Sequence, residues 1–531
     1  MTKITLCLLT LALTILCAGA KQPKDTVKIL TKAEKVDKWI KDSTQFRIYS
    51  MKEVDFIVNH IDSSYICGRR RLTEQQWQDN INVIRNKVAD CNPRDASYYY
   101  ALRYVGLLLN DAHFAFPDGG NYNRSRYFKD EDMLFPIWVK TWKDGSVYCV
   151  NDYEGKIPEH AQIISVNGHS AQSMALLNRK LYNAEDLNAM SMMNLDREPS
   201  VFIWQNFRNH MFMEGIKPPY KVAYSLLNST KIDTITLQGI TRQEQHKLYK
   251  KSGGKKRALK AQGKRTKIVS YKKMNDDVGV LQINSFWGRN FVELLVLGVD
   301  WTFSSQLNSS MRKAMRHNPP NFIIDLRLNP GGMTTNINKT LAYLTDKPID
   351  MAELIRVTDA NRFITKMVLG NGLKDLKVPK TDIERLQNLV DSVDSGTVLE
   401  TDSLFSLKIK PKTQKNKFTG NVYVLTSNYT YSAAQEFAQH FKLLELGETA
   451  GEPCGGYYII TTGNADPIRL PYYSGWLRFM IPRGVNKTFY ENGTYDYMPV
   501  DIPIEREFNE WLHGNDGSLN RLIEEIRTKH N

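Results

Sequence analysis

The sequence predicts a mixed α/β fold built from several structural units, and three observations support this prediction. Residues 28–115 carry apolar residues at helical spacing, residues 130–235 form short β-rich runs between turns, and residues 271–531 alternate apolar strands with helices. The chain has 531 residues, which suggests about three domains of about 150 residues each. Hydrophobic residues make up 42% of the chain and charged residues 24%, a composition typical of globular proteins.

Residues 1–20, MTKITLCLLTLALTILCAGA, have the pattern of a secretory signal peptide. One early lysine precedes an apolar run that ends in Ala-Gly-Ala, which is typical of a cleavage site. This run is short for a membrane span, and no other stretch has the length and apolarity to cross a bilayer. We therefore expect an exported protein, periplasmic or extracellular. Lipid anchoring at Cys17 is the alternative, which the bulky Leu16 before it disfavours.

Two helices are expected between residues 28 and 115. The segment QQWQDNINVIRNKVADCN carries apolar residues at spacings of three and four, which form one face of a helix: Trp77, Ile81, Ile84 and Val88. The segment SYYYALRYVGLLLNDAHF continues as a second apolar helix, which breaks at Asn110 and Asp111. Both stripes are interpreted as helix-packing surfaces.

The next region changes from helical spacing to short strands. The runs FPIWVKTW, SVYCVND, AQIISVNGHS and YKVAYSLL are β-rich and are separated by glycine and polar turns. Within this region, a strand is followed by a turn at Asn167-Gly168 and then by a helix.

A basic segment, KLYKKSGGKKRALKAQGKRTK at residues 247–267, follows the strands. It supplies much of the net charge of +14, which results from 71 basic and 57 acidic residues. The segment contains glycines and almost no apolar periodicity, so we interpret it as a solvated loop. Association with an anionic membrane surface is the alternative interpretation. Nucleic acid is not an expected partner, because no aromatic residues alternate with base-reading side chains.

The C-terminal half predicts a largely parallel sheet. A strand at 278–286 leads into a long helix that ends near residue 316, and NFIIDLRL and NVYVLTS are further buried strands, each followed by a turn and a helix. Residues 365–415 are polar and are expected to form an irregular insertion. The segment GSLNRLIEEIRTKHN predicts a terminal amphipathic helix.

The cysteines give no sign of a metal site. Two of the six lie in the signal segment, and the other four show no CxxC spacing: Cys67, Cys91, Cys149 and Cys454. Two interpretations stay open, a disulfide between Cys67 and Cys91 or four buried thiols.

Two strand–turn–helix junctions carry groups that suit acyl transfer. In DLRLNPGG, Gly331 and Gly332 permit positive φ and leave backbone N–H groups uncovered, and such groups can hold a developing negative charge. Ser432 opens a helix after a buried strand, and Ala433 follows it, so that small side chains keep the approach open. The serine is either a helix cap or a nucleophile. The chain has no GxSxG elbow, which disfavours an α/β-hydrolase.

The segments FIIDLRLNPGG, VYVLTSNYTYSAAQEFA and LGETAG resemble the superfamily of C-terminal processing (tail-specific) proteases. This superfamily also includes tricorn-type core proteases and retinoid-binding repeats. AQIISVNG resembles a strand of the PDZ-like domains of these proteins, with Ala161 where glycine is usual. The resemblance covers most of the mature chain and implies the following parts: an N-terminal helical region at 21–128, an inserted PDZ-like domain at 129–245, a basic loop at 246–270, and a ClpP/crotonase-like α/β protease core at 271–531.

The resemblance implies that Ser432 is the nucleophile. It also implies that the N–H of Ala433, together with that of Gly331 or Gly332, forms the oxyanion hole. The processing proteases activate their serine with a lysine shortly after T-x-G. This chain reads ETAGEPCGG there and has Glu452 at the corresponding position, which puts a Ser–Lys dyad in doubt.

The tricorn-like branch uses a histidine from the N-terminal region instead. LLLNDAHFAF resembles the D-x-H stretch of that branch, so His113 is the candidate base. A neutral imidazole suits proton transfer near neutral pH. That branch also places a glutamate near the C-terminal end, and YENGTYDYMPVDIPI offers Glu491, with Asp496 as the alternative.

The expected function is that of an exported serine endopeptidase that cleaves polypeptides through an acyl-enzyme on Ser432 and needs no metal or organic cofactor. Its PDZ-like domain would bind an extended peptide as an added strand. The alternative is a protein of the same fold that binds peptides or apolar ligands without catalysis, as the retinoid-binding repeats do.

Overall fold

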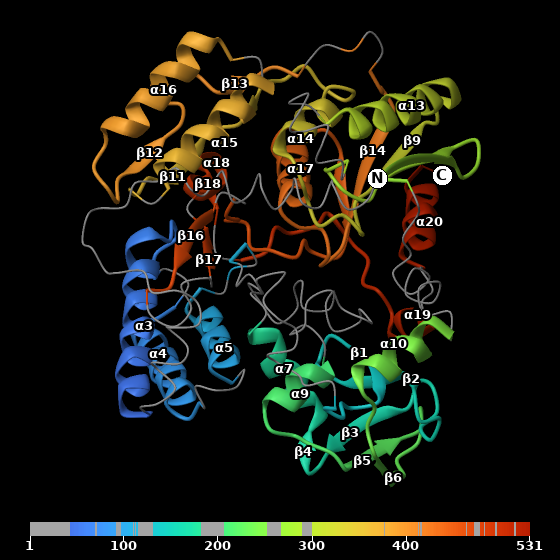
Figure 1. Ribbon diagram of the computed structural model, residues 1–531. Helices are drawn as coiled ribbons and strands as arrows, with labels where there is room; N and C mark the ends of the chain where they lie inside the picture. Colours follow the sequence, from blue (N-terminus) through green and yellow to red (C-terminus); the bar gives the residue numbers. More distant parts are fainter. Residues whose placement is uncertain are drawn as a thin grey trace, which may run out of the picture.

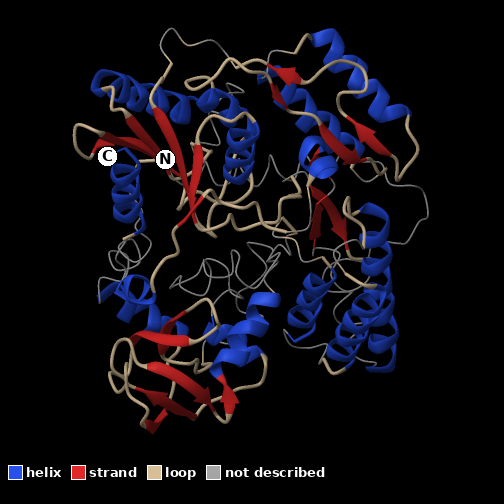
Figure 2. Cartoon of the chain, turned by 180° about the vertical axis from the view of Figure 1, so that it is seen from behind, coloured by secondary structure: helices blue, strands red, loops and turns tan. Residues whose placement is uncertain are grey.

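The structure is a computed structural model, and three groups of elements make up the molecule (Figure 1). A helical region and an antiparallel sheet lie below a larger part that contains a parallel sheet, and Figure 2 shows the same arrangement from behind. The structure describes residues 43–69, 72–91, 97–109, 111, 113–114, 131–181, 207–251, 267–288, 300–359, 361–375, 378–411, 414, 417–462, 465–471, 478–482, 484–493, 496–513 and 517–530.

Two predicted segments fall wholly or partly beyond these ranges. The signal peptide predicted at 1–20 lies outside the described residues, as does the central part of the basic segment, 252–266. Among the described residues, no helix combines the length and the apolarity that a membrane span requires.

The described part of the N-terminal region contains helices. Its elements are α3 (Ser43–Ser64), α4 (Glu74–Ala89), α5 (Ser97–Ala101) and the 3-10 helix η1 (Leu102–Leu108). The predicted stripe on α4 is confirmed, because Trp77, Ile81, Ile84 and Val88 are its buried residues. The second predicted helix differs, because most of it is 3-10. Nearly all of η1 is buried rather than one face alone, so packing decides its form more than helix propensity does.

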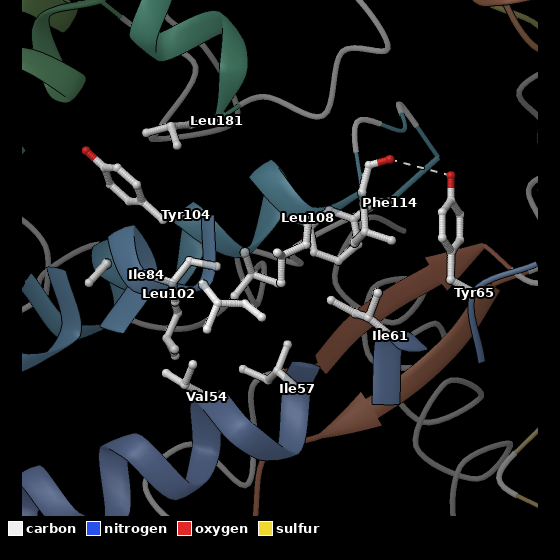
Figure 3. Close-up of a cluster of buried hydrophobic side chains, with 14 of the residues drawn as sticks. Val54, Ile57, Ile61, Tyr65, Ile84, Leu102, Tyr104, Leu108, Phe114 and Leu181 are labelled. Atoms are coloured by element: carbon white, nitrogen blue, oxygen red, sulfur yellow. Dashed lines mark hydrogen bonds between the residues drawn. The ribbon is translucent and has the colours of Figure 1, made fainter. Parts of the chain in front are cut away.

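The core of this region holds the segment that carries His113. In Figure 3, Val54, Ile57 and Ile61 of α3 point toward Leu102 and Leu108 of η1. All five side chains are buried. The chain after η1 is fixed at two further points, because Phe114 belongs to the same core and the Tyr65 hydroxyl donates a hydrogen bond to the Asp111 side chain at 2.7 Å.

The β-rich region forms an antiparallel sheet with the order β1-β2-β3-β5-β6, and β4 pairs with β3. The turn predicted at Asn167-Gly168 is confirmed, because it joins β3 to β4 and both of its residues have positive φ. The strands are β1 (Ile137–Thr141), β2 (Val147–Asp152), β3 (Gln162–Val166), β4 (His169–Ser170), β5 (Tyr220–Ser225) and β6 (Ile232–Leu237), and the helices are α7 (Ala171–Lys180), α9 (Phe207–Met213) and α10 (Arg242–Lys251).

The basic segment at 247–267 begins within helix α10 rather than in a loop. The segment was predicted as a loop from its start, but its first residues, 247–251, are the last turn of α10. Lys250 and Lys251 lie in that last turn, where positive side chains favour the helix dipole.

The predicted parallel sheet is confirmed. Its order is β19-β15-β14-β9-β8-β7, and all neighbours are parallel except β7 and β8. Its strands are β7 (Val269–Lys273), β8 (Val278–Ile283), β9 (Asn321–Asp325), β14 (Asn421–Thr426), β15 (Glu448–Gly451) and β19 (Ile502–Pro503).

Helices cover both faces of this sheet (Figure 1). Phe322 and Ile324 of β9 pack in the core with α13 (Trp301–His317), α14 (Thr334–Leu341) and α17 (Ala433–Leu443). Ile323 between them packs in a second core with α20 (Ser518–His530), the predicted terminal helix. Alternation of side chains along the strand explains this division.

Residues 365–415, predicted to be irregular, instead contain regular elements with their own core. Ile383, Leu386 and Val390 lie on one face of α16 and are buried there, at a helical spacing that the polar composition of the segment concealed. The elements of this part are α15 (Arg362–Asp375), α16 (Lys380–Ser392), β10 (Ile349–Asp350), β11 (Glu353–Arg356), β12 (Val398–Glu400) and β13 (Lys408–Ile409).

The remaining elements connect the three parts. Strand β18 (Gly484–Asn486) pairs with β11 and leads into α18 (Lys487–Asn492), while β16 (Ala465–Arg469) and β17 (Arg478–Pro482) form a hairpin beside α3. Helix α19 (Phe508–His513) brings Trp511 and Leu512 against Tyr148 of β2, which joins the C-terminal segment to the antiparallel sheet.

The cysteines outside the signal segment are free thiols. Cys67, Cys149 and Cys454 are buried and Cys91 is half-buried. Of the two open interpretations, free thiols describe this structure rather than a disulfide between Cys67 and Cys91, and the Cys91 thiol donates to the carbonyl of Lys87 at 2.9 Å.

Replacement of Phe437 tests how strongly α17 is held on the sheet. Its ring is fully buried and lies 5.7 Å from that of Phe286. Phe437→Ala should destabilise the protein by about 3–5 kcal/mol, because it leaves a cavity under the helix. The matched control is Phe363→Ala, because the residue Phe363 is 49% exposed. We expect thermal melting to shift down strongly for the first variant and little for the second, and equal shifts would contradict this packing.

Candidate active site

Ser432 lies at the junction between β14 and α17. It is the N-cap residue of α17, yet its side chain makes no capping hydrogen bond. Its backbone has φ 53° and ψ −131°, a conformation that is unfavourable for a residue with a side chain. Its hydroxyl oxygen lies 2.9 Å from Nε2 of His113. The hydroxyl therefore contacts an imidazole instead of capping its own helix.

His113 lies just beyond η1 and contacts three side chains. Apart from its contact with Ser432 through Nε2, its Nδ1 lies 3.1 Å from the Thr461 hydroxyl and 3.2 Å from the Tyr431 hydroxyl. The ring of Tyr431 packs against the imidazole at a centroid distance of 4.9 Å. The ring is thus held on both of its nitrogens and on one face.

Asp111 anchors the far side of this arrangement. Its side chain is fully buried. One carboxylate oxygen accepts hydrogen bonds from the Thr461 hydroxyl and from the backbone N–H of His113, both at 2.9 Å. The other oxygen accepts a hydrogen bond of 2.7 Å from the Tyr65 hydroxyl.

The contact with Thr461 favours one imidazole tautomer. A carboxylate can only accept, so the Thr461 hydroxyl uses its proton on Asp111 and offers a lone pair to Nδ1 of His113. Nδ1 then carries the ring proton, and Nε2 is left as the acceptor that faces the Ser432 hydroxyl. This is the tautomer that a general base needs to remove the serine proton.

The two acidic residues proposed near the C-terminal end, Glu491 and Asp496, lie at the surface. Glu491 is exposed on α18, and Asp496 is exposed and accepts a hydrogen bond from the backbone N–H of Tyr497. Among the described contacts of His113, neither carboxylate occurs. The structure places Asp111 near His113, through Thr461.

The sequence contained a signal for Asp111 but none for Thr461. An aspartate two residues before a histidine commonly accepts the backbone N–H of that residue, which is what Asp111 does. Thr461 comes from a segment 348 residues away from His113, and no local pattern marks it.

The two glycines of the Asn-Pro-Gly-Gly turn have different roles. The N–H of Gly331 donates to the Asn329 side chain at 2.9 Å, so it is already used. Gly332 lies opposite Phe286 in a parallel β-bridge. The N–H of Phe286 donates to the carbonyl of Gly331, and the carbonyl of Phe286 accepts a hydrogen bond from the N–H of Met333. In such a bridge the N–H of the central residue points away from the partner strand. The N–H of Gly332 therefore stays unbonded within the described part of the chain.

A second uncovered N–H belongs to Ala433, the first residue of α17. First-turn N–H groups have no partner inside their helix and carry the positive end of its dipole. A close approach brings the two junctions together, because a Cβ on Gly331 would lie 2.6 Å from the Cβ of Ser432. The geometry thus favours Gly332 and Ala433, rather than Gly331, as the donor pair.

A cavity of about 350 Å³ opens at these groups. It is lined by His113, Pro330, Gly332, Thr334, Tyr431, Ser432, Glu436, Ile460, Thr461 and Thr462. Glu436 is the carboxylic acid among these residues. Burial, and secondarily the nearby carboxylate of Glu353, raise the pKa of Glu436 to about 8.

A lysine base is not present in the described lining of this cavity. Glu452, at the position where the processing proteases carry their lysine, forms an ion pair of 2.8 Å with Lys143. In the ranges that the structure describes, His, Cys, Asp and Glu side chains do not gather in a group that would hold a metal ion.

Comparisons with known proteins agree with this arrangement. Residues 277–466 match the model of the family described as peptidase family S41, and this range includes Gly332, Ser432 and Ala433. A stretch of 134 residues is 30% identical to the probable CtpA-like serine protease of Staphylococcus haemolyticus (strain JCSC1435). That match spans 25% of this chain and 24% of the relative.

Solved structures share the fold over nearly the whole chain. The crystal structure of a CPAF mutant aligns with a TM-score of 0.56 at 13% identity and covers 88% of this chain and 95% of CPAF. Mature CPAF aligns with a TM-score of 0.55 at 14% identity and covers 90% and 96% of the two chains. At such identity the likeness concerns the fold alone. The likeness to peptidase family S41 is carried by residues 277–466.

Proposed function

We propose that this chain is an exported serine endopeptidase in which Ser432 is the nucleophile and His113 the general base. The observation that carries the proposal is the distance of 2.9 Å between the Ser432 hydroxyl and Nε2 of His113, two residues 319 positions apart in the sequence. Their meeting at a cavity beside unbonded N–H groups is the arrangement that acyl transfer requires.

The reaction follows from the positions of these groups. Nε2 of His113 takes the hydroxyl proton while Ser432 Oγ forms a bond to the peptide carbonyl carbon. The N–H groups of Gly332 and Ala433 stabilise the oxyanion that develops. The imidazolium then gives its proton to the leaving amine as the peptide bond breaks, and an acyl-enzyme remains. Water, deprotonated by the same imidazole, releases the second product and restores the serine.

Asp111 acts as a positioning residue through Thr461. Its negative charge stabilises the imidazolium that forms during each proton transfer, and its hydrogen bonds to Thr461 and to the His113 backbone fix the ring in one orientation. The Tyr65 hydroxyl supports the other carboxylate oxygen, which keeps this buried charge paired.

Three finer parts of the proposal rest on separate observations. The contact of His113 with Ser432 favours the His-containing tricorn-like branch over the Ser–Lys branch. The sheet β1–β6 with α7 and the AQIISVNG strand supports a PDZ-like module that binds the substrate polypeptide as an added strand. The pattern of residues 1–20 supports export.

Labelling with an alkyl fluorophosphonate tests the nucleophile and the base. We expect the probe to attach to Ser432, Ser432→Ala to abolish labelling, and His113→Ala to lower peptide hydrolysis by about 10⁴-fold or more, since serine and base act as a unit. His169→Ala, which removes an exposed histidine of β4, is the control and should behave as the wild type. A folded wild-type protein that neither reacts nor cleaves peptides contradicts the proposal and favours the non-catalytic binder.

Variants of the relay test the roles of Asp111 and Thr461. Asp111→Asn should lower kcat by about 10²- to 10⁴-fold with little change in KM, because the imidazolium loses its counter-charge. For the same reason the acidic limb of the pH–rate profile should move to lower pH. Thr461→Val should resemble Asp111→Asn, whereas Thr461→Ser keeps the hydroxyl and should retain most activity. Asp79→Asn, on the exposed face of α4, is the charge control. Equal activity of Thr461→Val and Thr461→Ser would refute the relay.

A further inference from the structure

Glu436 presents an unpaired carboxyl group to the cavity that contains Ser432. It lies one helical turn after Ser432 on α17, and its backbone N–H donates to the carbonyl of Ser432 at 2.9 Å. The residue is 6% exposed and lines the cavity. In the part of the chain that the structure describes, its carboxyl group takes part in no hydrogen bond or ion pair.

Among the other buried polar side chains of α17, the amides of Gln435 and Gln439 donate to partners, whereas Nε2 of His440 has none in the part of the chain that the structure describes. The Gln435 amide donates to the carbonyl of Tyr457 at 2.6 Å, and the Gln439 amide donates to that of Tyr458 at 2.7 Å. Both side chains thus have structural partners that explain their burial. A carboxyl group buried without a partner destabilises the fold, so a purely structural role does not explain Glu436.

The surroundings of Glu436 favour a cation as its missing partner. Apart from His113, the other described side chains that line the cavity carry no charge. The nearby carboxylate of Glu353 adds negative potential, which raises the pKa of Glu436 when no cation is present. A second carboxylate in the site would be repelled, whereas an ammonium or guanidinium group would be attracted.

The size of the cavity indicates what kind of cation fits. A volume of about 350 Å³ lies at the lower end of the range of about 300–1,000 Å³ that is usual for ligand sites. This space suits one long side chain better than a whole ligand molecule. The chain as a whole has a net charge of +14, so attraction of a basic group has to come from local carboxylates.

We propose that Glu436 is a specificity-determining residue that receives the lysine or arginine side chain of a polypeptide substrate next to the bond that Ser432 cleaves. This inference rests on the proposed peptidase function. In the bound state the ammonium or guanidinium group pairs with the Glu436 carboxylate, and the aliphatic part of the substrate side chain lies along Ile460 and Pro330.

Digestion of a random peptide library tests this inference, with the cleaved bonds mapped by mass spectrometry. For the wild type we expect lysine and arginine to be enriched about tenfold or more at one of the two positions that flank the cleaved bond. Glu436→Gln keeps the shape and removes the charge, so the enrichment should fall to background. Glu525→Gln removes an exposed charge of α20 and should leave the enrichment as in the wild type.

Fluorophosphonate labelling of the same samples separates the two proposals. A wild-type protein that is labelled at Ser432 and cleaves peptides without any preference for basic residues overturns this inference alone. A protein that is neither labelled nor active overturns the proposed function and this inference together. Enrichment that persists in a folded Glu436→Gln variant also overturns the role of Glu436, and a matching thermal melting curve identifies that variant as folded.

Discussion

The hydrogen bond between the Ser432 hydroxyl and the His113 imidazole is the interaction on which the site depends. It joins two parts of the chain with separate cores. The packing of α3 against η1 places the segment with His113, and the packing of α17 on the parallel sheet places Ser432. Neither core contains the bond itself, so its geometry is a consequence of how the helical region meets the α/β part. A small displacement of either part would separate the two atoms.

The local conformation of Ser432 explains why a serine at a helix start does not cap its helix. With φ at 53°, its side chain is directed toward His113, and the N–H of Ala433 stays uncovered within the described part of the chain. The same departure from an ordinary cap therefore exposes both a nucleophile and a donor for an oxyanion. Gly331 permits this arrangement because any side chain there would collide with Ser432, and Asn329 occupies its N–H. The donor role is thereby left to Gly332.

Local patterns in the sequence predicted much of this architecture and only part of the site. Three features depend on residues that are neighbours in the sequence: the buried face of α4, the strands of the parallel sheet, and the two junctions that carry the glycines and Ser432. A single sequence therefore reveals them. The relay from His113 through Thr461 to Asp111 depends on contacts across about 350 positions, and no periodicity encodes those. The acidic residues near 491–496 suggested a relay because they belong to a familiar segment. Both residues are exposed in the structure. In residues 380–392 the polar composition concealed a buried stripe.

Charge near the site is distributed locally rather than over the molecule. The chain is strongly basic, yet the groups around Ser432 include a buried carboxylate at Asp111 and an unpaired carboxyl group at Glu436. The first is satisfied by three hydrogen bonds and supports the imidazole. Within the described residues the second has no such partners, which is why we propose that it is available to a substrate.

A crystal structure of the protein after reaction with an alkyl fluorophosphonate would show whether Ser432 and His113 act in one site. We expect phosphorus bonded to Ser432 Oγ, a phosphoryl oxygen about 3 Å from the N–H groups of Gly332 and Ala433, and Nε2 of His113 at the same adduct. An adduct on another residue, or an adduct on Ser432 with the imidazole of His113 far from it, would refute the proposed pairing of nucleophile and base.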